Sequence, residues 1–399
     1  MKKIIFLILL LLFIQNQVIA GDYGVVKDGF PSWEERTVLV YTNRARSDPV
    51  AELKGCNVCA DKDCYKTPSK PLTYDYNLNR AARFHCANLI SCGGHLQHDS
   101  PCTLVSNLSN IYQPNGSCDG SASCACEGGK CGCNPSCTSW ANRVSLFGGS
   151  PSGENAAYGY SDPVQTFYQW FYEPESDPEC GFRYTNGHRV NILNNSHASM
   201  GVGNYQSYWT QDFSYSSAYT RRLYSGTHYP KSGKNIEFRA NWADSAAPSA
   251  ASVVIDGIAF EMDIERGSPT NGTYLYKANL PESCHKYYFL FKSSNGLVET
   301  FPDEGAYGLN CPLDYYEIRD SVDAGYTDTG PKDSYIDVVK DDGAVIDIVV
   351  PDHPHMGDSI SEDVIENLDI TTFDSIFIRD SYPDYVDESD SGCTCTAIY

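Results

Sequence analysis

The chain has 399 residues, 17 of them cysteine, and a formal net charge of −22. This length allows about three folded units. The excess of negative charge excludes nucleic acid as a partner, because binding to a phosphate backbone requires a basic surface.

Residues 1–20 are predicted to be a secretory signal peptide. Lys2 and Lys3 precede the apolar run Ile4–Ile14, and Val18-Ile19-Ala20 ends in a small residue suited to cleavage. The run is too short to span a bilayer, and no later stretch is long and apolar enough for a membrane helix. We therefore expect a secreted, extracellular protein without a transmembrane anchor.

Cysteine usage agrees with an oxidising compartment. Thirteen cysteines lie between Cys56 and Cys180, and we expect disulfides there rather than a zinc site or free thiols, including at Cys56-x-x-Cys59. The odd number leaves either one free thiol or one bridge to another region. Sequons for N-glycosylation occur at Asn107, Asn115, Asn194 and Asn271.

The first unit is expected to span residues 21–226. Apolar spacing predicts helices at 33–47 and 77–90, the first ended by Asp48-Pro49. Residues 118–137 hold six cysteines and few apolar side chains, so we interpret them as a surface insertion that disulfides must order. Residues 140–147, which follow this insertion, have an apolar face.

Asp162 is placed to cap a further helix that begins at Pro163. Residues 187–214 read GHRVNILNNSHASMGVGNYQSYWTQDFS. Gly187-His188-Arg189 begins a helical turn, and the segments 199–204 and 207–214 have the composition of two strands joined by a turn at Gln206-Ser207.

This stretch resembles the CAP superfamily of cysteine-rich secretory, venom-antigen and plant pathogenesis-related proteins. It is most similar to the branch that reads GHR-x-N-I-L, then G-V-G, then Y-W-T-Q-x-F. The segments V-Y-T-N-x-x-R near residue 42, Gly153-Glu154-Asn155 and Trp170-x-x-Glu173 resemble further family motifs. The resemblance covers about half of the chain. It implies an α+β fold: an α-β-α layered CAP/SCP domain with helices on both faces of a small, mainly antiparallel sheet.

The resemblance also implies four residues that face a central cleft: His98, Glu154, Glu173 and His188. Two imidazoles and two carboxylates can bind a divalent metal, zinc more readily than magnesium or calcium. The same set can polarise water for hydrolysis. It can equally form a hydrogen-bonded network that only fixes the shape of the cleft.

Two of these assignments have competitors. His95, in the sequence H-L-Q-H-D-S, is the alternative to His98 as the first cleft histidine. His85 is expected to be a structural residue of the second helix. Glu175 and Glu179 compete with Glu173, and many members of this branch lack that glutamate.

Residues 228–312 are expected to form a small β-sandwich. Short strand patterns occur at 236–240, 252–255, 258–264, 273–280 and 287–292. Asp256-Gly257 and Asn271-Gly272 are predicted turns between strands. Cys284 and Cys311 are the only cysteines of this unit and are expected to form a disulfide.

Residues 313–399 carry 22 acidic and four basic side chains. This composition predicts an acidic, weakly ordered tail with one hairpin at 335–339 and 344–350. Cys393 and Cys395 suit a bridge to another chain better than a strained bridge to each other.

We expect a secreted CAP-domain protein that acts as an extracellular binding or scaffolding module for a protein, lipid or glycan. The appended units favour this role over that of an enzyme, and no catalytic residue is assigned. The alternatives are a metal-dependent hydrolase that uses the His/Glu cleft, and a sterol or lipid carrier.

Overall fold

The computed structural model describes residues 21–113, 116–133 and 135–319, together with the backbone of 334–339 and 345–350. Residues 21–319 belong to one compact unit, and the last two segments belong to a second unit. The expected signal peptide, Asn115, Cys393 and Cys395 lie outside the described residues.

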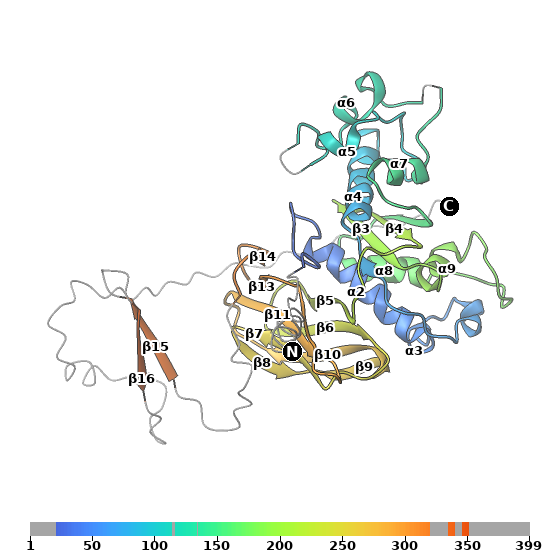
Figure 1. The fold of residues 1–399 in the computed structure, drawn as a ribbon. Helices are drawn as coiled ribbons and strands as arrows, with labels where there is room; N and C mark the ends of the chain where they lie inside the picture. Colours follow the sequence, from blue (N-terminus) through green and yellow to red (C-terminus); the bar gives the residue numbers. More distant parts are fainter. Residues whose placement is uncertain (1–20, 114–115, 134, 320–333, 340–344, 351–399) are drawn as a thin grey trace, which may run out of the picture. The chain divides into compact units, whose positions relative to one another are not determined.

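A four-stranded sheet with strand order β1-β3-β4-β2 forms the centre of the first domain. The strands are β1 (Thr73–Tyr74), β2 (Gly153–Tyr158), β3 (Ser199–Tyr205) and β4 (Tyr208–Ser214). Only β1 and β3 are parallel. Helix α4 (Tyr76–Ser91) covers one face, and α2 (Trp33–Ser47), α8 (Pro163–Phe171) and α9 (Gly187–Leu193) cover the other (Figure 1). This arrangement confirms the predicted α-β-α layers.

The close packing of α4 on the sheet depends on two glycines of β3. A Cβ added to Gly201 would lie 2.0 Å from the backbone nitrogen of Asn79, and one added to Gly203 would lie 2.1 Å from the backbone of Ala82. Any larger residue would push the helix away from the sheet. The G-V-G pattern therefore sets the spacing of these two layers.

Local caps fix where the main helices begin. Ser32 and Glu35 form a capping box at the start of α2, and Asp75 accepts two backbone N–H groups at the start of α4. Asp162 accepts the N–H of Gln165 at the start of α8, as its position before Pro163 predicted. Shorter helices complete the domain: α3 (Pro49–Leu53), η1 (Ala60–Cys64), α5 (Leu108–Ile111), α6 (Ala122–Ala125), η2 (Glu127–Gly129) and α7 (Trp140–Leu146).

Disulfides order the insertion around α5 and α6, which contains few apolar side chains. Four bonds tie it together: Cys92–Cys131, Cys102–Cys126, Cys118–Cys124 and Cys133–Cys137. Two more, Cys56–Cys59 and Cys64–Cys180, hold the loops at the opposite end of the domain. The thirteenth cysteine of this region, Cys86, is a buried free thiol.

The second domain is a β-sandwich. One sheet has the order β5-β6-β10-β9, and the other has the order β14-β13-β11-β7-β8 with β12 beside β11. The strands are β5 (Leu223–Tyr229), β6 (Asn235–Ala243), β7 (Ala250–Ile255), β8 (Ile258–Glu261), β9 (Asp263–Ser268), β10 (Asn271–Asn279), β11 (His285–Lys292), β12 (Val298–Phe301), β13 (Ala306–Leu309) and β14 (Tyr315–Tyr316). Cys284 is bonded to Cys311.

Three details of the sandwich differ from the prediction. The expected boundary at 226–228 falls inside β5, which pairs with β6 and so belongs to the sandwich. The sandwich also continues past residue 313, because β14 pairs with β13. Asn271-Gly272 is not a turn: Pro269 and Thr270 form the turn, and Asn271 begins β10 while its side chain donates to the carbonyl of Ser69.

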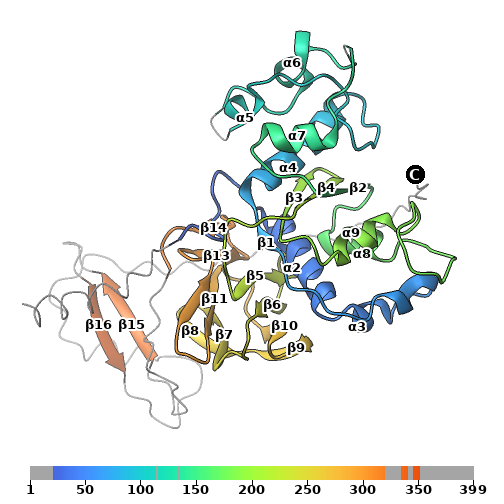
Figure 2. The same cartoon turned by 45° about the vertical axis from the view of Figure 1, so that its right-hand side comes forward.

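Helix α2 lies between the first sheet and the sandwich and is buried almost all round (Figure 2). Trp33 Nε1 donates to the carbonyl of His228 at 2.9 Å, and Asn43 Nδ2 donates to Ser225 Oγ at 3.0 Å. One hydrophobic cluster extends from the layered domain into the sandwich. The two domains therefore share a core through α2.

The second unit contains an antiparallel hairpin of β15 (Ser334–Val339) and β16 (Val345–Val350), close to the predicted positions. None of the helices in the described part of the chain has the length and apolar character needed to cross a membrane.

Candidate functional site

His98 and Glu154 form the first of two histidine–glutamate pairs. His98 follows the end of α4, and its Nδ1 lies 2.8 Å from Oε1 of Glu154 on β2. The glutamate side chain is buried, whereas the imidazole is 52% exposed. The hydrogen bond to Glu154 raises the pKa of His98 above its usual value, in spite of partial burial.

His188 and Glu173 form the second pair. His188 is the second residue of α9, and its Nδ1 lies 3.0 Å from Oε1 of Glu173. The other carboxylate oxygen, Oε2, accepts the backbone N–H of His188 at 3.1 Å. Glu173 is buried and the His188 ring is 30% exposed. The glutamate thus fixes both the start of the helix and the ring that follows it.

The two pairs lie on either side of the edge strand β2. Glu154 points to the face of the sheet that α4 covers, and its neighbour Asn155 points to the opposite face. Asn155 Nδ2 donates to the carbonyl of His188 at 3.1 Å, and Asn191 Nδ2 of the same helix donates to the carbonyl of Glu154 at 3.1 Å. These hydrogen bonds between β2 and α9 therefore link the two histidine–glutamate pairs.

A buried arginine contacts the glutamate of the first pair. The side chain of Arg143, on α7, is fully buried and forms an ion pair with Glu154 Oε2. Its Nη1 also donates to the carbonyl of His98 at 2.8 Å. Burial raises the pKa of Glu154, but the Arg143 charge and the His98 hydrogen bond more than reverse this and lower it to about 2. Glu154 is therefore ionised.

The competing residues lie elsewhere. His95 is exposed, while His85 is fully buried and its Nε2 donates to the carbonyl of Gln97 at 2.8 Å, which fits the structural role expected for it. Burial lowers the pKa of His85 to about 3, so the ring is neutral. Glu175 accepts from Thr185 and the N–H of Asp177, and Glu179 is exposed.

Residues 39–219 match the family model described as the cysteine-rich secretory protein family, CAP. This match identifies residues 39–219 as a CAP domain. With seven disulfides among the described residues, the chain is a CAP-domain protein of the extracellular type.

Among the solved structures that match is an extracellular protein containing an SCP domain from Bacillus anthracis str. Ames. It is 20% identical, and the match covers 45% of this chain and 39% of that chain with a TM-score of 0.27. A search of curated proteins gave no match.

The CAP site fits a metal held by two histidines better than one held by four side chains. Both rings use Nδ1 on a glutamate, which leaves Nε2 as the atom that can bind an ion, and zinc-binding histidines are commonly held in this way. Glu154 is engaged by His98 and Arg143, and Glu173 is engaged twice by His188. The glutamates therefore orient the histidines.

The spacing of ligand atoms does not support a site with three or four side-chain ligands. Among the residues that the structure describes, only Cys118, Asp119 and Cys124 bring three donor atoms within 4.8 Å of one another, and those cysteines are joined in a disulfide. Three donors of the four cleft residues do not meet this closely. Water would have to complete the shell of an ion held by His98 and His188.

A trio in the sandwich has the distances of a serine-nucleophile site but not its chemistry. Ser283 Oγ lies 3.2 Å from His285 Nε2, and His285 Nδ1 lies 2.5 Å from Asp256 Oδ2. The same Nε2 faces the carbonyl of Pro281 at 3.1 Å. A carbonyl can only accept a hydrogen bond, so this contact competes with Ser283 for Nε2. The trio holds the Asp256 turn against β11.

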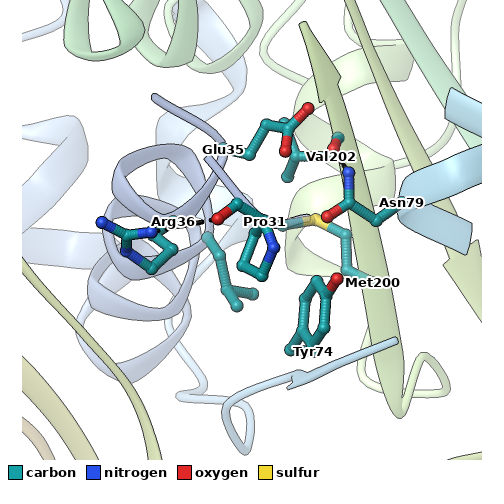
Figure 3. A pocket seen from close by; sticks show the side chains of 8 residues that line it. Pro31, Glu35, Arg36, Tyr74, Asn79, Met200 and Val202 are labelled. Carbon is teal, nitrogen blue, oxygen red and sulfur yellow. Dashed lines mark hydrogen bonds between the residues drawn. The ribbon is translucent and has the colours of Figure 1, made fainter. Parts of the chain in front are cut away.

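Figure 3 shows a pocket at the opposite edge of the CAP sheet, beside α2, α4 and β3. Its lining includes Pro31, Arg36, Tyr74, Asn79 and Met200. It has no room for a bound molecule, and none of the four cleft residues lines it. We therefore assign no binding role to this pocket.

Proposed function

We propose that this CAP protein is secreted and acts as an extracellular binding or scaffolding module, with a zinc-type divalent ion held by His98 and His188. The observation that carries the proposal is the shared geometry of the two pairs. In each, a buried glutamate fixes Nδ1 of a partly exposed histidine and leaves Nε2 available. A metal held here would give the cleft a Lewis acid for a carboxylate, carbonyl or phosphate group of a partner.

The domain arrangement supports a binding role. Helix α2 joins the CAP domain and the sandwich through a shared core, so a partner would meet one continuous body. Disulfides and this core stabilise the fold, and the ion is not needed for it. A chelator should therefore remove the metal and leave the CAP domain folded.

Zinc titration by calorimetry tests the site at about pH 7.5 and about pH 5, above and below the usual imidazole pKa of ~6.5. Wild type should bind at the higher pH and bind more weakly at the lower one, because protons compete for Nε2. His98→Ala and His188→Ala should each abolish binding. His95→Ala is the matched control, since this exposed histidine lies in the same loop, and it should bind as wild type does.

Two results would contradict the metal site. Equal binding by all variants would place the ion elsewhere, and absence of binding by wild type would leave a hydrogen-bonded network that only shapes the cleft. A peptide-hydrolysis assay addresses the enzyme alternative. Zinc-dependent activity that disappears in Glu154→Gln would favour a hydrolase over a binding module.

A further inference from the structure

Asp212 is a buried acid that the proposed metal site does not use. It lies on β4, is completely buried, and neither carboxylate oxygen accepts a hydrogen bond from an N–H or O–H group of the described residues. The strand register places it directly opposite Glu154 on one side and Gly201 on the other. Cross-strand partners point to the same face, so Asp212 and Glu154 meet beneath α4.

The charged and titratable groups around Asp212 do not include a free cation. Helix α4 contributes His85, which is neutral. Helix α7 contributes Arg143, whose Nη atoms contact Glu154, the carbonyl of His98 and Ser100 Oγ, and whose Nε–H has no partner among the described residues and forms no hydrogen bond with Asp212. Strand β2 contributes the ionised Glu154, with the partly exposed His98 on its far side.

An ionised Asp212 would be a second buried carboxylate beside Glu154, without a donor of its own. Such a charge is strongly unfavourable. Burial first, and the Glu154 charge second, raise the pKa of Asp212 well above its usual value, and Arg143 only partly offsets them. A protonated acid has a single O–H group to place, and Glu154 is the charged acceptor in front of it.

We propose that Asp212 is a positioning residue: it carries a proton and donates it in a hydrogen bond to Glu154, which in turn holds His98. Glu154 then accepts from three donors: the O–H of Asp212, the Nδ1–H of His98 and the guanidinium of Arg143. This role rests on the proposed function, because it acts on the ion only through His98. This hydrogen bond explains why a fully buried aspartate occurs at position 212 of β4.

Two substitutions test whether Asp212 acts as an uncharged hydrogen-bond donor to Glu154. Asp212→Asn is uncharged, as the protonated acid is, and its amide still donates to Glu154, so it should rescue the role. Asp212→Ala removes the donor. Near-ultraviolet circular dichroism of both variants checks that the fold is kept, and wild type with Asp212→Asn suffices if the alanine variant does not fold.

The first measurement needs no metal. Infrared difference spectra of wild type minus Asp212→Asn at neutral pH should show the C=O stretch of a protonated carboxylic acid. Absence of that band would mean that Asp212 is ionised and would overturn the proposal. A histidine titration by NMR should give the same midpoint for His98 in wild type and Asp212→Asn. A large fall in the asparagine variant would show that a negative charge had been removed, and would also overturn it.

The second measurement uses zinc alone as the probe. Asp212→Asn should bind zinc within about threefold of wild type, and Asp212→Ala should bind about tenfold more weakly, as for other residues that support a metal-binding histidine. Equal affinities in all three proteins would refute the positioning role. If wild type binds no zinc, the proposed metal function fails by itself. Two results then decide the role of Asp212. One is the carboxylic-acid band in the infrared difference spectrum. The other is the titration midpoint of His98, which should change only in Asp212→Ala.

Discussion

Replacing Arg143 with methionine should destabilise the CAP domain strongly. The substitution keeps much of the side-chain length but removes the cation that faces Glu154. Both side chains are buried, so water cannot replace the lost partner. Removing one member of a buried ion pair typically costs about 3 to 5 kcal/mol.

The pKa of Glu154, to which the Arg143 charge contributes, points to a similar magnitude. It is lowered from 4.5 to about 2, and each unit is worth about 1.4 kcal/mol, so the ionised carboxylate contributes about 3 kcal/mol at neutral pH. Because the pKa is depressed in the folded state, this contribution is present above about pH 4.5 and is lost as the pH falls through about 2. The deficit of Arg143→Met should therefore shrink in acid.

Urea unfolding of wild type and Arg143→Met under non-reducing conditions, at about pH 7 and about pH 3, measures both effects. Arg183→Met is the control, because its ion pair with Asp177 is partly exposed and should be worth less than about 1 kcal/mol. A loss below about 1 kcal/mol for Arg143→Met at neutral pH, or a loss that does not change with pH, would refute the reasoning.

Glu173→Gln should weaken zinc binding about tenfold, much less than His98→Ala, because it orients a histidine and is not itself a ligand; calorimetry would show the order. Asn271 should carry no glycan, since its Nδ2 donates to a backbone carbonyl and its Oδ1 is buried, whereas the exposed Asn107 is open to modification; glycopeptide mass spectrometry would compare the two. Cys86, whose burial raises its thiol pKa to about 12, should react with iodoacetamide only after unfolding, which peptide mapping would detect.

The elements that the sequence predicted well are those with local causes. Helix α2 begins at the capping box of Ser32 and Glu35, and α8 begins after Asp162 and Pro163, so nearby residues fix both starts. Strands β3 and β4 follow from their composition around a short turn. The two histidine–glutamate pairs were expected from the family resemblance, although that resemblance could not show that each glutamate holds a ring by Nδ1.

The missed residues act through contacts between distant segments. Arg143 and Asp212 looked like a helix residue and a strand residue, and their meeting at Glu154 depends on how α7, β2 and β4 pack. A charged residue at an inward position of a strand was the one available signal for Asp212. Helix α2 showed an ordinary amphipathic pattern, yet the sandwich buries its second side.

By itself, then, the sequence determined the caps, the strand composition, the glycines under α4 and the set of cysteines, because each depends on a few neighbouring residues. Only the tertiary structure decided which cysteine stays free, which helix joins the two domains, and which acid keeps its proton. Those outcomes depend on burial and on the distance between groups far apart in the chain, and the cost of an unpaired charge is set by these two quantities.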